Sequence, residues 1–309
     1  MPKARKRKVP VVPVDRATTS ASKPQVTRTV IREFHVLLKR QAYLQKSGLK
    51  NAETYKELKE IEDRIEELGG LERYQHMSAV GQKEDRGGGS HRIFIGWLKE
   101  LGAHLQRKEK LRYTSFLSRC VCILKSRRLL EVGALKPDNY QSCSSWIDVF
   151  PIDLNSRHPA IKEQDFLKLD PVENKEKWEA ISLSLVLNFV PDAKDRGRML
   201  RLAHEMLGEN GYFFVAVRLG APSPSQRLKD SLQLPLPCLS NSRYLTFERF
   251  KELMEAVGFV QLREKWKEGG KMVYYLYQKG TSTGPSRLFS KKEVLRTGNR
   301  NNFCILLDV

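Results

Sequence analysis

The sequence contains no G-x-G-x-x-G run, the glycine-rich turn that holds the diphosphate of dinucleotide cofactors. The closest stretch is LLEVGALKPDNY (129–140), where an apolar run leads into Glu131 and then Gly133, with no later glycine. A single glycine permits close backbone approach but does not build a phosphate cradle. The missing glycines argue against NAD. They leave open a turn for another cofactor or an ordinary strand end.

Cysteine is scarce, and long apolar runs are missing. The five cysteines are odd in number and form no C-x-x-C pair, so we expect neither a disulfide framework nor a zinc site. This usage is typical of a reducing compartment. No apolar stretch approaches the roughly 18 residues of a membrane span, and the N-terminus lacks the apolar segment of a signal peptide. We therefore expect no metal centre and no membrane partner.

Acidic residues are outnumbered, with 36 Asp and Glu against 55 Lys and Arg and a formal net charge of +19. Such an excess favours a polyanionic partner, above all a nucleic acid, because phosphates are neutralised and counterions released. An acidic protein or a membrane surface would also fit the charge alone. The opening run MPKARKRKVP holds five basic residues and no acid, which predicts a nuclear or nucleolar address. A solvated tail is the alternative.

The chain divides by composition into four parts. Residues 1–27 lack periodicity and are expected to form a disordered basic tail. Residues 28–120 are expected to form a helical N-terminal region, in which a helical hairpin precedes a polar loop at 74–91 that either carries function or only links elements. Residues 121–280 form the expected cofactor-binding domain, and residues 281–309 a C-terminal tail.

The pattern within residues 121–280 predicts an α/β fold. Near-continuous apolar runs alternate with amphipathic helices, which indicates a mostly parallel sheet covered on both faces. The last two strands are joined only through Gly269-Gly270, as in an antiparallel hairpin. Dinucleotide dehydrogenases do not usually end in this way. The pattern predicts a Rossmann-like class I methyltransferase fold with a seven-stranded sheet ending in an antiparallel hairpin.

Gly133 and Asp153 have the spacing of a cofactor site. Asp153 ends the second apolar run, 20 residues after Gly133, at the separation expected between a glycine turn and a ribose-binding acid. An ionised carboxylate accepts hydrogen bonds from both ribose hydroxyls and repels a phosphate. S-adenosylmethionine has no diphosphate, so one glycine suffices. Taken singly, Gly133 could simply turn the chain and Asp153 could cap a helix.

Three further residues are candidates by position. Asp165, in QDFL, lies where an acid or amide commonly receives the adenine amino group, although it could equally belong to a surface turn. Asn188 and Phe189 end the fourth predicted strand, where the donor methyl and the acceptor base must meet. Phe189 could stack on a base and Asn188 could orient one. Alternatively, Phe189 belongs to the core and Asn188 caps the helix that begins near Asp192.

With these residues identified, the chain resembles the fungal nucleolar family that methylates adenine N1 in 25S large-subunit rRNA. The likeness runs from roughly Arg32 to Gly280. It is carried by five ordered blocks: YQHMSAVGQ, LLEVGALKPDN, IDVFPIDLNSRHPAIKEQDFL, WEAISLSLVLNFVPDAKDRGRML and NGYFFVAVRL.

The resemblance implies S-adenosylmethionine as donor, with cofactor contacts at Gly133 and Asp153. Glu131, Asp165 and Gln75 are added as cofactor-binding candidates, Gln75 because the polar loop near it could close over the cofactor. The implied partner is 25S rRNA or a pre-ribosomal particle, met in the nucleolus by a monomeric enzyme.

The chemistry implied by the resemblance needs alignment more than acid–base catalysis. Adenine N1 is already a lone-pair nucleophile, and it lies on the pairing edge, so the base must be unpaired or flipped. Asn188 and Phe189 are the candidates that position it. Two other readings stay open: methylation of a ribosomal or basic protein, and an inactive RNA-binding assembly factor that keeps the fold.

Overall fold

The computed structural model describes residues 24–48, 51–81, 89–104, 126–218, 239, 242–266, 272–282, 286–298 and 300–308. The chain forms two compact units, Met1–Ser78 and Ala79–Val309. This division falls earlier than the expected boundary at residue 120. The basic opening run lies outside the described residues. None of the helices in the described ranges is long and apolar enough to cross a membrane.

The first unit contains a helical hairpin. Helices α1 (Pro24–Ser47) and α2 (Ala52–Glu67) are joined at Asn51, whose side chain accepts a hydrogen bond from the backbone N–H of Thr54 and caps α2. Ion pairs from Arg40 to Glu57 and from Arg64 to Glu33 link the two helices. The hairpin confirms the helical periodicity. Because α1 begins at Pro24, the expectation that the disordered tail reaches residue 27 is wrong.

The expected polar loop at 74–91 is wrong over its first half. Helix α3 runs from Gly70 to Gly81. Leu71, Tyr74 and Met77 recur at three-residue spacing in this stretch, a helical repeat that the polar residues between them conceal. The Tyr74 ring stacks on Phe34 of α1 at 4.8 Å, and Met77 is buried. Residues 82–88 lie outside the described part of the chain, and α4 (His91–Glu100) begins directly after Ser90.

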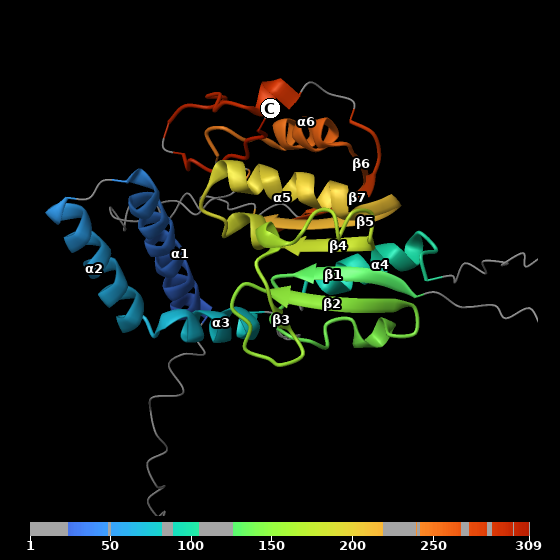
Figure 1. Ribbon diagram of the computed structural model, residues 1–309, viewed down its shortest axis with the longest axis horizontal. Coiled ribbons are helices and arrows are strands. Elements are labelled where there is room, and N and C mark those ends of the chain that lie inside the picture. Colours follow the sequence, from blue (N-terminus) through green and yellow to red (C-terminus); the bar gives the residue numbers. More distant parts are fainter. Residues whose placement is uncertain are drawn as a thin grey trace, which may run out of the picture. The chain divides into compact units, whose positions relative to one another are not determined.

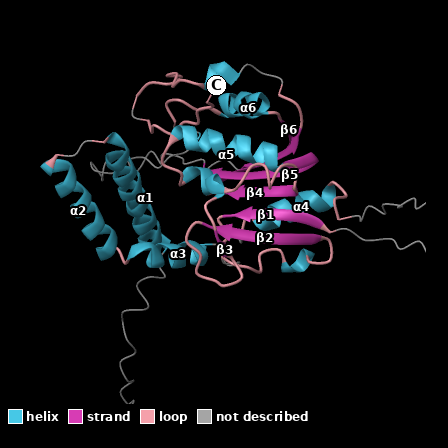
Figure 2. Cartoon of the chain, viewed as in Figure 1, coloured by secondary structure: helices cyan, strands magenta, loops and turns pink. Residues whose placement is uncertain are grey.

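The second unit is built on one seven-stranded sheet (Figures 1 and 2). The strands lie in the order β3-β2-β1-β4-β5-β7-β6. All pairs are parallel except those that β7 makes with β5 and β6, so the sheet ends in the antiparallel pair that the sequence predicts. The Gly269-Gly270 turn lies outside the described residues. The strand bounds are β1 Arg127–Val132, β2 Ile147–Asp153, β3 Lys162–Glu163, β4 Trp178–Ser184, β5 Leu207–Arg218, β6 Phe259–Trp266 and β7 Met272–Lys279.

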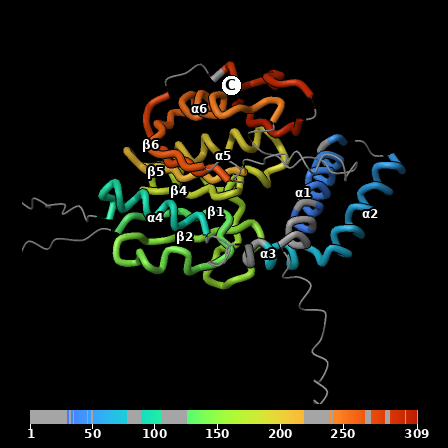
Figure 3. Tube along the Cα trace, turned by 180° about the vertical axis from the view of Figure 1, so that it is seen from behind, coloured from blue at the N-terminus to red at the C-terminus, as the bar shows by residue number. Residues whose placement is uncertain are grey.

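The sheet is buried on both faces, as its continuous apolar strands predict. Along β5, Phe213 and Val215 join one core cluster, which includes α5 (Ala193–Met206) and α6 (Phe247–Val257). Phe214 and Ala216 point the other way, into a cluster with α4. Figure 3 shows the α4 side. This alternation confirms a Rossmann-like fold with helices on both faces.

The expected C-terminal tail is an integral part of this unit. A short 3-10 helix, η8 (Ser286–Phe289), is followed by an extended segment in which Phe303, Ile305 and Leu307 are buried in the same cluster as α5 and α6. The backbone N–H of Leu306 donates to the Ala193 carbonyl at 2.9 Å. The apolar run FCILL is too short for a helix, but Phe303, Ile305 and Leu307 pack in the cluster that includes α5.

Candidate active site

The carboxyl ends of β1, β2, β4 and β5 meet at one edge of the sheet. Val132 of β1 pairs in register with Ile152 of β2 and with Leu183 of β4, so the residues that follow these strands are neighbours. The chain moves to opposite sides of β1 in its two halves, which makes β1 the switch point where ligands of such sheets bind. Gly133 and Asp153 are thereby brought together, as their spacing predicts.

Gly133 takes the left-handed conformation that strongly favours glycine, with φ of 76°. A Cβ at this position would lie 2.8 Å from Cγ2 of Val186 in the loop after β4. The backbone N–H groups of Gly133 and Ala134 both donate to the Ile152 carbonyl, at 2.8 and 3.1 Å. These groups serve the neighbouring strand rather than an anion. The turn is therefore not a phosphate cradle.

Asp153 ends β2 and is half-buried. Its Oδ1 accepts a hydrogen bond from the Asn155 backbone N–H at 2.9 Å, and its own carbonyl accepts from the N–H of Gln164. Burial and the nearby Glu163 carboxylate raise the pKa of Asp153, whereas the Asn155 bond lowers it. Asp153 therefore caps a local turn and not a helix. A carboxylate can accept about four hydrogen bonds, which suits it to a pair of hydroxyls.

Glu131, on β1, carries a buried carboxylate. Its Oε1 accepts a hydrogen bond from the Asn139 side chain at 2.7 Å, while Oε2 has no hydrogen-bond partner among the residues that the structure describes. Burial raises the pKa of Glu131 from 4.5 to about 7, despite the Asn139 bond. A buried oxygen without a donor is costly, so this position suits a ligand that brings an N–H donor or a positive charge. The residues present therefore fit an S-adenosylmethionine-type ligand.

Because the pKa of Glu131 is raised, the free energy of unfolding of the cofactor-free protein should depend on pH. Below pH 4.5 the Glu131 carboxyl is protonated in both the folded and the unfolded state. Between pH 4.5 and about 7 it ionises in the unfolded state but not in the folded state, so the free energy of unfolding falls as the pH rises through this range. The wild type should therefore lose up to about 3 kcal/mol of unfolding free energy between these pH values relative to Glu131→Gln. Urea unfolding at pH 4.5 and pH 8 measures this. Parallel pH profiles for the two proteins would contradict it.

The local contacts of Asp165 and the burial of Gln75 do not by themselves assign either residue to a cofactor. Asp165 caps the 3-10 helix η4 (Phe166–Lys168), where its Oδ1 accepts from the Leu167 N–H at 2.9 Å. This is the surface-turn role weighed for it, although the side chain is half-buried. Gln75 is buried on α3 in the first unit. Its assignment to the cofactor stays a prediction.

The loop after β4 holds Asn188 and Phe189. Leu185 opens it in the left-handed conformation, with φ of 66°, and the 3-10 helix η5 spans Val186–Asn188. Asn188 is 3% exposed, and its Oδ1 accepts from the Arg218 backbone N–H at the end of β5, at 3.1 Å. The cap of α5 is Asp192, so Asn188 does not have that role. Phe189 is only partly buried, in contrast to the fully buried Leu187.

The sequence did not single out Ser90, Ser184 and His91, which lie near this edge of the sheet. The hydroxyl of Ser90 lies 2.5 Å from that of Ser184, the last residue of β4. His91 contacts the Tyr140 ring at 5.9 Å, and burial together with Lys136 lowers the pKa of His91. Their only signal was the end of the polar stretch at residue 91, since contacts across 94 residues leave no local pattern.

Comparison with known proteins identifies the family of the chain. The sequence model of the family described as "25S rRNA (adenine(2142)-N(1))-methyltransferase, Bmt2" matches residues 59–305. The chain is 32% identical over 280 residues to a 25S rRNA adenine-N(1) methyltransferase of Schizosaccharomyces pombe, covering 90% of this chain and 91% of that protein. It is 30% identical over 250 residues to the 25S rRNA (adenine(2142)-N(1))-methyltransferase of Saccharomyces cerevisiae, covering 80% of this chain and 63% of that protein.

Solved structures resemble the chain only in part. A 1,6-didemethyltoxoflavin-N1-methyltransferase from Burkholderia thailandensis has a TM-score of 0.37 at 15% identity, covering 62% of this chain and 87% of that one. A 16S rRNA (adenine(1408)-N(1))-methyltransferase from Catenulisporales acidiphilia has a TM-score of 0.35 at 12% identity, covering 51% and 87%. The strand order itself assigns the fold as a class I methyltransferase. By the family match and both curated relatives, the chain belongs to the Bmt2 family of 25S rRNA adenine-N1 methyltransferases.

Proposed function

We propose that this protein transfers the methyl group of S-adenosylmethionine to N1 of an adenine in 25S rRNA. The observation that carries the cofactor assignment is the arrangement at the end of β1 and β2. A left-handed glycine, a half-buried aspartate and a buried carboxylate oxygen that has no donor among the described residues meet at the switch point of the sheet. Family membership supports the acceptor, and the net charge of +19 supports an RNA partner.

Each candidate residue has a distinct role in holding the donor. Gly133 lets the backbone approach the ligand, and Asp153 accepts hydrogen bonds from the ribose hydroxyls. Asp165 receives the adenine amino group, and Glu131 receives the positively charged amino group of the methionine end. Gln75 is kept as a predicted cofactor contact on the basis of the resemblance. When bound, the cofactor supplies an electrophilic methyl group on its sulfonium.

Asn188 and Phe189 position the acceptor base. The adenine N1 lone pair is the nucleophile, so the loop must aim it at the methyl group rather than remove a proton. Phe189 provides a face on which an unpaired base stacks. Asn188 fixes the loop against β5 through the Arg218 N–H and so sets the direction in which Phe189 is presented. Water exclusion by the stacked base favours the same alignment.

The cellular setting follows from the same reading. We infer a nucleolar enzyme that acts during ribosome biogenesis, as a monomer, on 25S rRNA or a pre-ribosomal particle. The basic run at the start of the chain supports a nuclear address.

Whether the methyl acceptor is RNA or protein is tested by measuring how a radioactive methyl label divides between the two. Radiolabelled S-adenosylmethionine is incubated with the protein, rRNA that lacks the modification, and ribosomal proteins, and the RNA and protein fractions are counted separately. Label is expected in RNA only. Label in the protein fraction would instead identify a protein methyltransferase, and no transfer to RNA or pre-ribosomal particles despite cofactor binding would identify an assembly factor.

A further inference from the structure

The loop after β4 is held from two sides, and one of them is the C-terminal segment. We infer that Arg196 and residues 300–308 form a brace that positions this loop, and with it Asn188 and Phe189, for methyl transfer. Arg196 is on this account a positioning residue: it lies behind the loop and acts through it. The inference deepens the proposed function and rests on it.

Arg196 joins the loop to the C-terminal segment through all of its guanidinium nitrogens. Nε donates to the Val190 carbonyl at 2.9 Å and Nη2 to the Pro191 carbonyl at 3.0 Å. Nη1 donates to the carbonyl of Cys304, 108 residues later in the chain. The guanidinium carbon also lies 4.5 Å from the centre of the Phe303 ring. A rigid planar fork suits this bridging role, which a lysine cannot reproduce.

The environment of Arg196 shows that the brace is built into the core. The residue is 4% exposed, and burial lowers its pKa to about 10, so it stays charged at neutral pH. A buried cation is retained at a cost and needs every donor satisfied. Here each of the three guanidinium nitrogens donates to a backbone carbonyl, and the guanidinium lies over the Phe303 ring.

The C-terminal segment is fixed closely enough to act as an anchor. The Leu306 N–H donates to Ala193, the first residue of α5, and the Leu307 N–H donates to Phe289. Gly197 lies against the Leu306 backbone, and a Cβ at position 197 would overlap the Leu306 carbonyl. Glycine inside a helix costs about 1 kcal/mol relative to alanine, so its presence here is explained by this close approach.

The loop needs an anchor because its own geometry is strained. Leu185 is held in the left-handed region, which costs roughly 1–2 kcal/mol for a residue with a side chain. One side of the loop is tied to β5, by Leu185 to Ala216 and by Asn188 to Arg218. The Arg196 brace ties the other side. Loosening it would let the loop relax and misalign the base, while the cofactor contacts at β1 and β2 would be unchanged.

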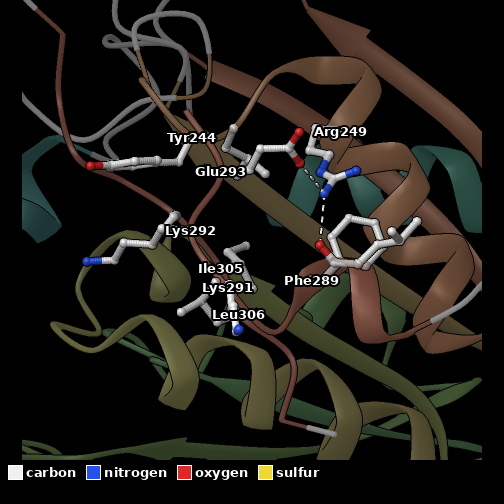
Figure 4. Close-up of a pocket in the computed structure, with 11 residues that line it drawn as sticks. Tyr244, Arg249, Phe289, Lys291, Lys292, Glu293, Ile305 and Leu306 are labelled. Atoms are coloured by element: carbon white, nitrogen blue, oxygen red, sulfur yellow. Dashed lines mark hydrogen bonds and ion pairs between the residues drawn. The ribbon is translucent and has the colours of Figure 1, made fainter. Parts of the chain in front are cut away.

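A second arginine offers a matched control. Arg249 of α6 donates to the Leu288 carbonyl and pairs with Glu293, both at 2.9 Å, and its guanidinium carbon lies 4.4 Å from the Phe289 ring centre (Figure 4). It fastens the earlier part of the C-terminal region by the same chemistry. Its partners are not those of the loop after β4.

The first test measures the loop directly and needs no substrate. Hydrogen–deuterium exchange over residues 185–192 is compared among Arg196→Lys, Gly197→Ala, Arg249→Lys and wild type. We expect exchange at least about tenfold faster for Arg196→Lys and Gly197→Ala, which disturb opposite sides of the brace, and no change for Arg249→Lys. Unchanged exchange in the first two would overturn the brace even if the enzyme is active. If Arg196→Lys fails to fold, Gly197→Ala decides.

The second test separates positioning from stability. In single-turnover methylation of rRNA, Arg196→Lys and Gly197→Ala should lower the rate by on the order of 10- to 100-fold, the cost of a small misalignment. The dissociation constant for S-adenosylhomocysteine should stay within about twofold of wild type. Arg249→Lys should keep the wild-type rate. If all three variants lose rate, and the loss follows the fall in melting temperature, Arg196 contributes only to general stability and does not position the loop. An inactive wild type would instead contradict the proposed function. The hydrogen–deuterium exchange experiment would then still test the brace, because it does not depend on activity.

Discussion

Asp153→Asn is expected to weaken the binding of S-adenosylhomocysteine by about 100-fold or more. Hydrogen bonds to a charged group contribute about 1.5–3 kcal/mol each, and the substitution removes the charge from a pair of them. The amide keeps the size of the side chain and can still accept from the Asn155 N–H, so the turn after β2 should persist. Calorimetric titration of the folded variant measures the loss.

The same carboxylate predicts how binding depends on pH. The pKa of Asp153 is raised, and only the ionised form accepts from both hydroxyls, so wild-type affinity should fall as the pH drops through that raised pKa. The Asp153→Asn protein should show no such fall from this residue. Asp148→Asn, at the exposed start of the same strand, is the control and should bind as the wild type does. Equal affinity of the Asp153 and Asp148 variants would remove Asp153 from the site.

The second large effect is expected at the loop after β4. Asn188→Ala and Phe189→Ala should each lower the rate of methyl transfer by about 100-fold, while the affinity for S-adenosylhomocysteine changes little. Asn188→Ala also leaves the Arg218 N–H without its present acceptor, so this variant should lose about 1–3 kcal/mol of stability. Phe189→Ala should lose less, because that side chain is only partly buried.

Asn174→Ala is a matched control for the asparagine. Asn174 is also buried, and it accepts from the Trp178 indole N–H at the opposite end of β4. Its loss should reduce stability without a specific loss of rate. If Asn188→Ala and Asn174→Ala have the same turnover once both are folded, Asn188 is a structural residue. If Phe189→Ala keeps the wild-type Michaelis constant and rate, no base stacks on Phe189.

The sheet and its cofactor edge were predictable because their signals are local. Strands buried on both faces are continuous apolar runs, and the helices between them repeat apolar residues every three or four positions. The interval from Gly133 to Asp153 is one connection and the strand β2, so a distance along the sequence predicts a distance in space. The cap of α5 was not assigned correctly, since the sequence offered Asn188 for it and the structure has Asp192.

Other features were not predictable because their causes lie far apart in the chain. The burial of Phe303, Ile305 and Leu307 depends on packing in the core cluster with α5 and α6, which forms only in the folded unit. Arg196 reads as one of many cations on an amphipathic helix until Cys304 is placed next to it. The same holds for Ser90 and Ser184. Helix α3 was missed for a different reason, since its polar composition outweighed a short helical repeat.

Methyl transfer to adenine N1 is tested most directly by identifying the methylated atom in the RNA. Large-subunit rRNA lacking the modification is incubated with S-adenosylmethionine and either wild type or Asp153→Asn. It is then analysed by nucleoside mass spectrometry and by reverse transcription, which N1 methylation arrests because it blocks the pairing edge of adenine. We expect N1-methyladenosine and a single new arrest at one adenine with wild type, and strong reduction of both with the variant when S-adenosylmethionine is kept below saturation. A different methylated nucleoside, or N1-methyladenosine formed equally by the Asp153 variant, would contradict it.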